Sequence, residues 1–295
     1  MEEKTMFKSK SKLLLMVMGL ILLLVLSTGC GSFGNTGGEN KIKFGVIASF
    51  TGPNAKPGLS MKQGAQLAVD EINASGGING KLLEPIYEDD ASVPAQSVSA
   101  TEKLIGKDEV AFLIGTFNSS TTLADMEIIA RDKTPMLVPV AVASGITELG
   151  NKWVFRNAAT NPMQAEQLMN FIYETTNQRK FAVIHESTDY GKGLAKAITE
   201  YVKAKGGALI TESYNIGDTD FYAQLTKIKN YQPDGIIICG NLSEGSQITR
   251  QIKELGINVQ LYGFGGLSSF DYNNIAGGSN EKLIATSYFE SNSPN

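Results

Sequence analysis

The sequence predicts an α/β protein made of two domain-sized halves, each with a parallel sheet flanked by helices. From residue 41 onward, short apolar runs alternate with amphipathic stretches. This alternation is typical of parallel sheets that carry helices on both faces. The composition agrees, because 42% apolar and 19% charged residues indicate a globular chain, and 295 residues are enough for two ordinary domains.

The first half contains five strand-like runs separated by helical stretches. The clearest helix places Ala65, Ala68, Val69 and Ile72 on one face at spacings of three and four residues, and the serine and glycines at 75–77 end it. Buried strands are predicted at residues 42–48, 82–87, 110–114 and 136–138, and residues 153–156 form a further strand-like run.

The second half repeats the pattern after a boundary at residues 155–162. There Asn161 is predicted to cap a helix, with Pro162 in its first turn. Two later helices show one apolar face each, the first along residues 194–202 and the second along residues 248–255. Strands are predicted at residues 181–185, 208–214, 235–239, 259–263 and 283–287.

The first thirty residues have the features of an export signal. Four lysines precede an apolar run at residues 13–26, broken only by Gly19, which is too short for a bilayer-spanning helix and suits a signal peptide. Residues 27–30, Ser-Thr-Gly-Cys, resemble a bacterial lipobox, in which the cysteine is lipidated, although Ser27 stands where leucine is usual. The alternative is an ordinary signal peptide with an incidental Cys30. Residues 30–40 have the composition of a flexible tether.

Composition excludes several classes of function. The net charge is −4 and no basic tract is present, which excludes nucleic acid as a partner. One histidine and two cysteines exclude multi-histidine and cysteine-cluster metal sites, so no metal and no cofactor are expected. His185 is interpreted as structural, and Gly191 and Gly193 lack the third glycine of a dinucleotide fingerprint. The protein is therefore predicted not to be an enzyme.

One loop places glycine, serine and threonine where a parallel sheet binds its ligands. Residues 115–122 follow the strand predicted at 110–114, and ligands lie at the carboxyl ends of such strands. Gly115 permits close backbone approach, while Ser119 or Ser120 is expected to cap the next helix and leave N–H groups facing outward. The loop is either an uncharged anion cradle or a plain helix cap, and the two roles can coexist.

Several motifs occur together in a fixed order along the chain. They are residues 70–78 (DEINASGGI), 87–91 (YEDDA), 115–120, 185–193 and 219–221. With these motifs, residues 41–290 resemble the leucine/isoleucine/valine-binding type of extracellular solute-binding protein, which serves ABC importers. The resemblance implies the periplasmic-binding-protein type I fold, in which two Rossmann-like lobes, hinged by three crossing segments, close over a ligand.

The resemblance also implies how the chain is divided. Residues 1–29 form the lipoprotein signal peptide and 30–40 the tether. Residues 41–156 form lobe 1, residues 157–284 form lobe 2, and residues 285–295 begin the second crossing back to lobe 1. Family members then add further elements to lobe 1 and cross a third time. The chain is therefore expected to be truncated at its C-terminus, with apolar surface of lobe 1 left uncovered.

Particular residues take roles from the resemblance. Ser119 would bond the ligand carboxylate, and Val142 stands where amino-acid binders carry threonine. Gly265 stands where an acid often faces the ammonium, and Glu244 either supplies that charge or is a solvated acid at a helix N-terminus. Tyr190 and Phe117 either line the pocket or pack in the core. The candidate ligand-binding residues are Phe117, Ser119, Ser120, Ala141, Val142, Tyr190, Asn241, Glu244 and Gly265.

These observations lead to one functional hypothesis and two alternatives. The chain is predicted to be a monomeric solute-binding lipoprotein outside the cytoplasm, held at the membrane by lipid on Cys30, that delivers an amino acid to an ABC permease. By family default the ligand is a branched-chain amino acid. The alternatives are a binder of another small carboxylate or amide, and a surface ligand sensor of the same fold.

Overall fold

A computed structural model describes residues 40–269, 271–278 and 283–287. The predicted signal peptide at 1–29, Cys30 and the tether up to residue 39 lie outside the described residues, as do residues 288–295 of the predicted second crossing. None of the helices that are described is long and apolar enough to cross a bilayer.

The first sheet contains five parallel strands in the order β2-β1-β3-β4-β5. They are β1 (Lys41–Ala48), β2 (Leu82–Asp89), β3 (Leu113–Gly115), β4 (Met136–Val138) and β5 (Val154–Arg156). Four helices accompany them: α2 (Ala55–Ala74), α3 (Pro94–Gly106), α4 (Ser119–Asp132) and the short α5 (Gly145–Glu148).

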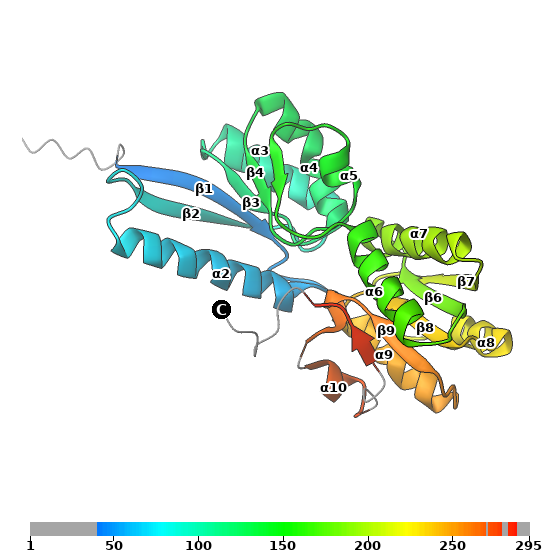
Figure 1. Ribbon diagram of the computed structural model, residues 1–295. Coiled ribbons are helices and arrows are strands. Elements are labelled where there is room, and N and C mark those ends of the chain that lie inside the picture. Colours follow the sequence, from blue (N-terminus) through cyan, green and yellow to red (C-terminus); the bar gives the residue numbers. More distant parts are fainter. Residues whose placement is uncertain (1–39, 270, 279–282, 288–295) are drawn as a thin grey trace, which may run out of the picture. The chain divides into compact units, whose positions relative to one another are not determined.

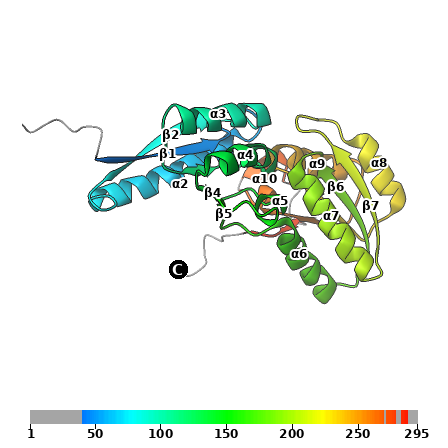
Figure 2. The same cartoon turned by 90° about the horizontal axis from the view of Figure 1, so that it is seen from above.

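Helices cover both faces of the first sheet, because alternate strand residues are apolar on each side. Ile47 and Met136 pack with Leu104 of α3 and Ile129 of α4 on one face. Phe44 and its neighbours pack with α2 on the other. Figure 2 shows α3 and α2 on opposite sides of β1 and β2.

The second sheet also contains five parallel strands, in the order β10-β9-β8-β6-β7. They are β6 (Lys180–Glu186), β7 (Ala208–Tyr214), β8 (Gly235–Cys239), β9 (Gln260–Gly263) and β10 (Leu283–Ala285). The helices are α6 (Asn161–Thr175), α7 (Asp189–Ala204), α8 (Tyr222–Tyr231), α9 (Leu242–Glu254), the 3-10 turn η1 (Gly265–Leu267) and α10 (Asp271–Ile275). Figure 1 traces this order along the chain.

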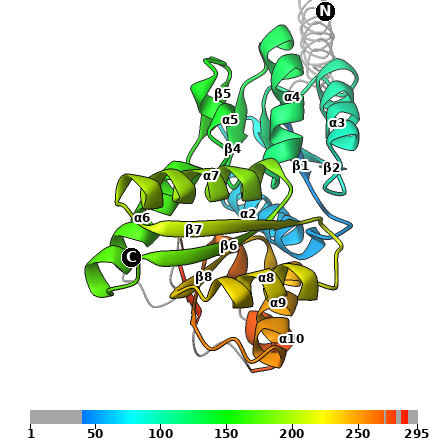
Figure 3. The ribbon, with the colours of Figure 1, turned by 90° about the vertical axis from the view of Figure 1, so that its right-hand side faces the viewer.

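The core of the second sheet divides in the same way. Phe181 and Val183 face α6 and α7, whereas Ala182 and Ile184, one residue along, face α8 and α9. Figure 3 shows α7 and α8 on opposite sides of β6 and β7. The predicted α/β architecture with two parallel sheets flanked by helices is confirmed. The lobe limits at residues 156 and 284 stay a prediction.

Several predicted limits were wrong: the strands predicted at 153–156, 259–263 and 283–287 lie at 154–156, 260–263 and 283–285. Two further differences have a local cause. The third strand starts at Leu113 instead of Val110, because the amide of Val110 still donates to the Leu104 carbonyl in the turn that follows α3. The cap of α6 is Thr160, one residue before the predicted Asn161, and its hydroxyl accepts from the Met163 amide. Asn161 instead lies buried in the first turn.

The first sheet keeps some apolar surface in contact with solvent. The side chains of Leu137 on β4 and Phe155 on β5 are 40% and 57% exposed. Both project from the face opposite their strand neighbours Met136 and Val154, which pack in the core with α3 and α4. Among the described residues, no helix covers that end of the face, because α2 packs against β1 and β2.

Candidate functional site

Loops at the carboxyl ends of strands in both sheets line a pocket of about 490 Å³. Asn54 follows β1, Phe117–Ser119 follow β3, and Val140–Val142 follow β4; from the second sheet come the loops after β6, β8, β9 and β10. This is where parallel sheets place their ligands, and the volume suits a small molecule. Of the predicted residues, the pocket is lined by Phe117, Ser119, Ala141, Val142, Tyr190, Asn241 and Gly265.

Ser119 is held as a hydrogen-bond donor aimed at the pocket. Its hydroxyl oxygen accepts from the backbone amides of Val142 at 3.3 Å and Ala143 at 3.1 Å. The residue is only 3% exposed and lines the pocket. Because the oxygen is occupied by two N–H groups, the hydroxyl proton is left to donate to a ligand acceptor. Val142 therefore contributes through its backbone despite having no hydroxyl.

The expectation that Ser119 or Ser120 caps the helix was wrong. Asn118 is the N-cap of α4 and makes no side-chain capping bond, so the two serines lie inside the first turn. Ser119 thereby turns toward the loop after β4. The hydroxyl of Ser120 points elsewhere and donates to the Asp189 carboxylate at 2.6 Å, and Ser120 does not line the pocket.

Gly115 allows this loop to approach the neighbouring strand. Its φ is 154°, and a Cβ atom at this position would lie 2.5 Å from the carbonyl oxygen of Ile47. No side chain fits at that distance. The close backbone approach expected at Gly115 is therefore seen, although it is directed at β1.

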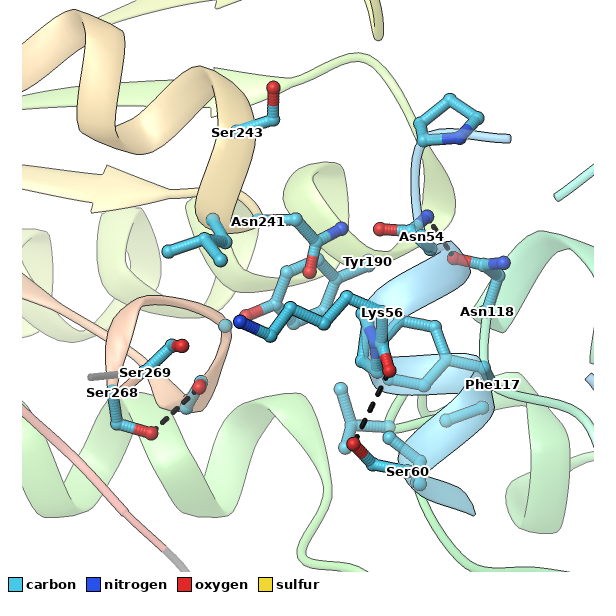
Figure 4. A pocket seen from close by; sticks show the side chains of 18 of the residues that line it. Asn54, Lys56, Ser60, Phe117, Asn118, Tyr190, Asn241, Ser243, Ser268 and Ser269 are labelled. Carbon is cyan, nitrogen blue, oxygen red and sulfur yellow. Dashed lines mark hydrogen bonds between the residues drawn. The ribbon is translucent and has the colours of Figure 1, made fainter. Parts of the chain in front are cut away.

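A polar network supports the wall formed by the first sheet. Asn54 and Asn118 line the pocket, and the Asn54 amide donates to the Asn118 side-chain oxygen at 2.8 Å. Asn118 in turn donates to Ser49 at 3.0 Å, and Ser49 donates to the buried Asp90 at 2.6 Å. Figure 4 shows the Asn54–Asn118 bond at the edge of the pocket. These hydrogen bonds fix the orientations of the Asn54 and Asn118 side-chain amides from the side away from the pocket.

The second sheet contributes Tyr190 from the first turn of α7 and Asn241 from the N-terminus of α9. The side-chain amide of Asn241 donates to Glu186 Oε2 at 3.2 Å. Gly265 and Gly266 complete this wall after β9. A Cβ on Gly266 would lie 3.0 Å from the side-chain oxygen of Asn241, so glycine leaves room for that amide.

Two buried carboxyls lie behind Asn241. Glu186 is 2% exposed and Glu244 is 4% exposed. Burial raises the pKa of Glu186 to about 7; the hydrogen bond from Thr188 acts against this, while the Glu244 carboxylate adds to it. Burial also raises the pKa of Tyr214 well above its usual value, and these carboxylates add to that effect.

Neither expectation for Glu244 describes its surroundings. It is not a solvated acid, because it is buried, and it does not line the pocket. One of its oxygens accepts a hydrogen bond from the Gly217 amide at 2.9 Å, so the carboxylate binds a backbone group within the second half of the chain. Within the described residues, the charged side chain that lines the pocket is Lys56, which pairs with Asp271.

The sequence interpretation missed Asn54, Asn118, Lys56 and Gln164, all of which line the pocket. Asn54 and Lys56 follow β1, so the same strand-end argument that selected Ser119 applies to them. Gln164 lies on α6, which follows the first sheet, and no local pattern marks it. Glu186 was missed because an acid at the end of an apolar strand does not show whether it is buried.

The sequence of the chain matches a known protein family. A family model described as "Periplasmic binding protein" matches residues 41–295. The "Leu/Ile/Val-binding protein homolog 3" of Brucella melitensis is 35% identical over 240 residues, which is 80% of this chain and 64% of that protein. The chain thus spans less than two thirds of the length of this relative.

Solved structures resemble most of the chain as well. A leucine-binding protein LivK from Thermotoga maritima superposes with a TM-score of 0.80 at 27% identity, covering 84% of this chain and 70% of that one. LivJ from Streptococcus pneumoniae, solved in complex with isoleucine, gives a TM-score of 0.74 at 32% identity, covering 80% of this chain and 67% of that one. The relatives are named as binding proteins rather than enzymes.

Proposed function

Because the chain belongs to the periplasmic binding protein family and has its type I fold, we propose that it is the solute-binding component of an ABC importer. Its ligand is an amino acid, and a branched-chain side chain agrees with the names of the relatives. The protein binds this ligand outside the cytoplasm and presents it to a permease. It acts as a monomer, and lipid on Cys30 holds it at the membrane.

One observation carries the proposal: the Ser119 hydroxyl stands in a pocket that both sheets line, with its oxygen occupied by two backbone amides. A hydroxyl in this state donates its proton, and a carboxylate oxygen is a strong acceptor for it. Phe117, Val140 and Leu242 add apolar surface to the same pocket, which suits an aliphatic side chain.

The composition of the pocket wall supports closure of the two lobes over the ligand. A ligand that touches both Ser119 and Tyr190 gains contacts from both halves only when the halves are close. The closed form is therefore favoured by the ligand's differential affinity for it. In this structure the Ser120 hydroxyl of α4 donates a hydrogen bond to the Asp189 carboxylate of α7, which joins the two halves.

Calorimetry on the 295-residue chain tests the ligand class. We expect leucine, isoleucine and valine to bind, and leucinamide to bind far more weakly than leucine because it lacks the carboxylate. The variant Ser119→Ala should weaken leucine binding by more than tenfold, the effect of about 1.5–3 kcal/mol for a hydrogen bond to a charged group.

Ser60 supplies the matched control. It lines the same pocket, but its hydroxyl proton is already donated to the Lys56 carbonyl at 3.3 Å. Ser60→Ala should therefore leave the affinity for leucine nearly unchanged. If leucinamide binds as tightly as leucine, or if Ser119→Ala matches the control, then the carboxylate is not held at Ser119 and the proposal fails.

A further inference from the structure

We propose that Glu186 is a positioning residue: it holds the side-chain amide of Asn241 so that the amide oxygen faces the pocket and accepts a hydrogen bond from the ammonium group of the ligand. The inference rests on the proposed function, because it requires an amino acid in this pocket. It assigns the ammonium a neutral acceptor on the wall formed by the second sheet, at a site where Gly265 contributes no side chain.

The position of Asn241 leaves its side chain available for this role. Asn241 is the N-cap of α9 but makes no side-chain capping bond. Its Nδ2 donates to Glu186 Oε2 at 3.2 Å, and its Oδ1 lies against Gly266, which also lines the pocket. No described residue donates a hydrogen bond to Oδ1. Figure 4 shows the Asn241 amide among the pocket side chains.

Glu186 itself acts only through Asn241. It is 2% exposed and does not line the pocket. Its other carboxylate oxygen accepts from the hydroxyl of Thr188, the residue that caps α7. A Cβ on Gly191 would lie 2.6 Å from the Glu186 side chain, so α7 packs directly on it. The carboxylate is therefore fixed in place, and it fixes the amide that it faces.

The ionisation of Glu186 decides which end of the amide faces the pocket. An ionised carboxylate only accepts hydrogen bonds, so it binds the NH₂ end of Asn241 and leaves the oxygen for the ligand. A protonated carboxyl also donates, and it can bind the amide oxygen instead. The amide then presents NH₂ to the pocket, and an ammonium group is repelled where it was bound.

The groups around Glu186 bring its ionisation into an accessible pH range. The groups that face Glu186 are Glu244 on α9, Tyr214 on β7 and Cys239 on β8, with His185 and Asp189 beside it in the chain. Burial is the largest cause and Glu244 adds to it, so the pKa of Glu186 rises to about 7. Affinity for an amino acid should therefore fall as the pH drops through 7.

Calorimetry of leucine binding between pH 5.5 and 8.5 tests the proposal. In the wild-type chain we expect about a tenfold loss of affinity at the acid end. Glu186→Gln, a neutral isostere, cannot ionise, so its affinity for leucine should no longer change with pH. Asn241→Ala removes the amide, so it should bind leucine about tenfold more weakly than the wild type at pH 8.5 and also lose the pH dependence. Adding Glu186→Gln to Asn241→Ala should change little, because Glu186 acts through Asn241.

Glu244→Gln provides the matched control. It replaces the other buried carboxyl, whose Oε1 accepts from the Gly217 amide, whereas the side-chain amide of Asn241 donates to Glu186. This variant should keep tight binding at pH 8 and shift the midpoint to lower pH, because it removes a like charge near Glu186. A merely structural role for Glu186 would not produce such a shift. Unchanged pH profiles in Glu186→Gln and Glu244→Gln would overturn the proposal.

A measurement without ligand separates this proposal from the proposed function. In ¹⁵N-labelled protein, the side-chain amide signal that disappears in Asn241→Asp belongs to Asn241. It should titrate with a midpoint near 7 in the wild type and stay constant in Glu186→Gln. If it does not titrate, the positioning role is wrong. If it titrates but no amino acid binds at any pH, the positioning role is supported, while the proposed function and the ammonium assignment fail.

Discussion

Asp125 should make the protein less stable as the pH rises, and a single isosteric variant should remove that effect. Asp125 lies on α4 and is fully buried. Ser97 donates to one carboxyl oxygen at 2.7 Å, and the other oxygen has no partner among the described residues. Burial is the main cause, and the nearby Asp90 adds to it, so the pKa of Asp125 rises from 3.8 to about 7.

The sign and the size of this effect follow from the linkage between proton binding and folding. The folded protein keeps the proton up to about pH 7, whereas the unfolded chain releases it near pH 3.8. The stabilisation that Asp125 contributes to the folded state is therefore fully present below pH 3.8, and it is lost as the pH rises through 7. Between these values the free energy of unfolding falls by about 1.4 kcal/mol per pH unit for this group, or about 4 kcal/mol in total.

Urea denaturation between pH 5 and 8, followed by the fluorescence of Trp153, measures this slope. Asp125→Asn cannot ionise, so we expect its free energy of unfolding to fall less steeply with pH than that of the wild type, by about 1 kcal/mol per pH unit. The exposed Glu127 on the same helix supplies the control variant Glu127→Gln. If Asp125→Asn and the wild type show parallel slopes, Asp125 is ionised in the folded protein and the reasoning is refuted.

Two further predictions concern the backbone and the N-terminus. Gly115→Ala should lower stability by about 1–3 kcal/mol in a thermal melt, because a Cβ at this position meets the Ile47 carbonyl. The control Gly64→Ala in α2 should be neutral or stabilising, because a Cβ there meets nothing within 4 Å. Equal melting curves would contradict the close approach. Cys30→Ala should abolish lipidation, so the variant moves to the aqueous phase in detergent partitioning while the wild type stays with detergent; identical partitioning argues against the anchor.

The sequence alone was sufficient for the architecture, because strand and helix periods are local. The runs at residues 136–138, 208–214 and 235–239 became β4, β7 and β8 with the predicted limits. The rule that ligands lie at the carboxyl ends of parallel strands then selected the loop of Ser119, while the family resemblance selected Tyr190 and Asn241; all three line the pocket. The strand-end rule needs only the order of apolar and polar residues along the chain, whereas the resemblance depends on particular motifs.

Only the tertiary structure decided which side chain at each strand end faces the pocket and which is buried or bonded elsewhere. Ser119 and Ser120 are adjacent, yet about 100° of helical rotation turns one toward the pocket and the other toward Asp189. Glu244 looks like a surface acid in sequence but is buried. Glu186 meets Asn241 across 55 positions in the chain. Such pairings depend on how strands β6 and β8 lie side by side, and a local pattern carries no information about that contact.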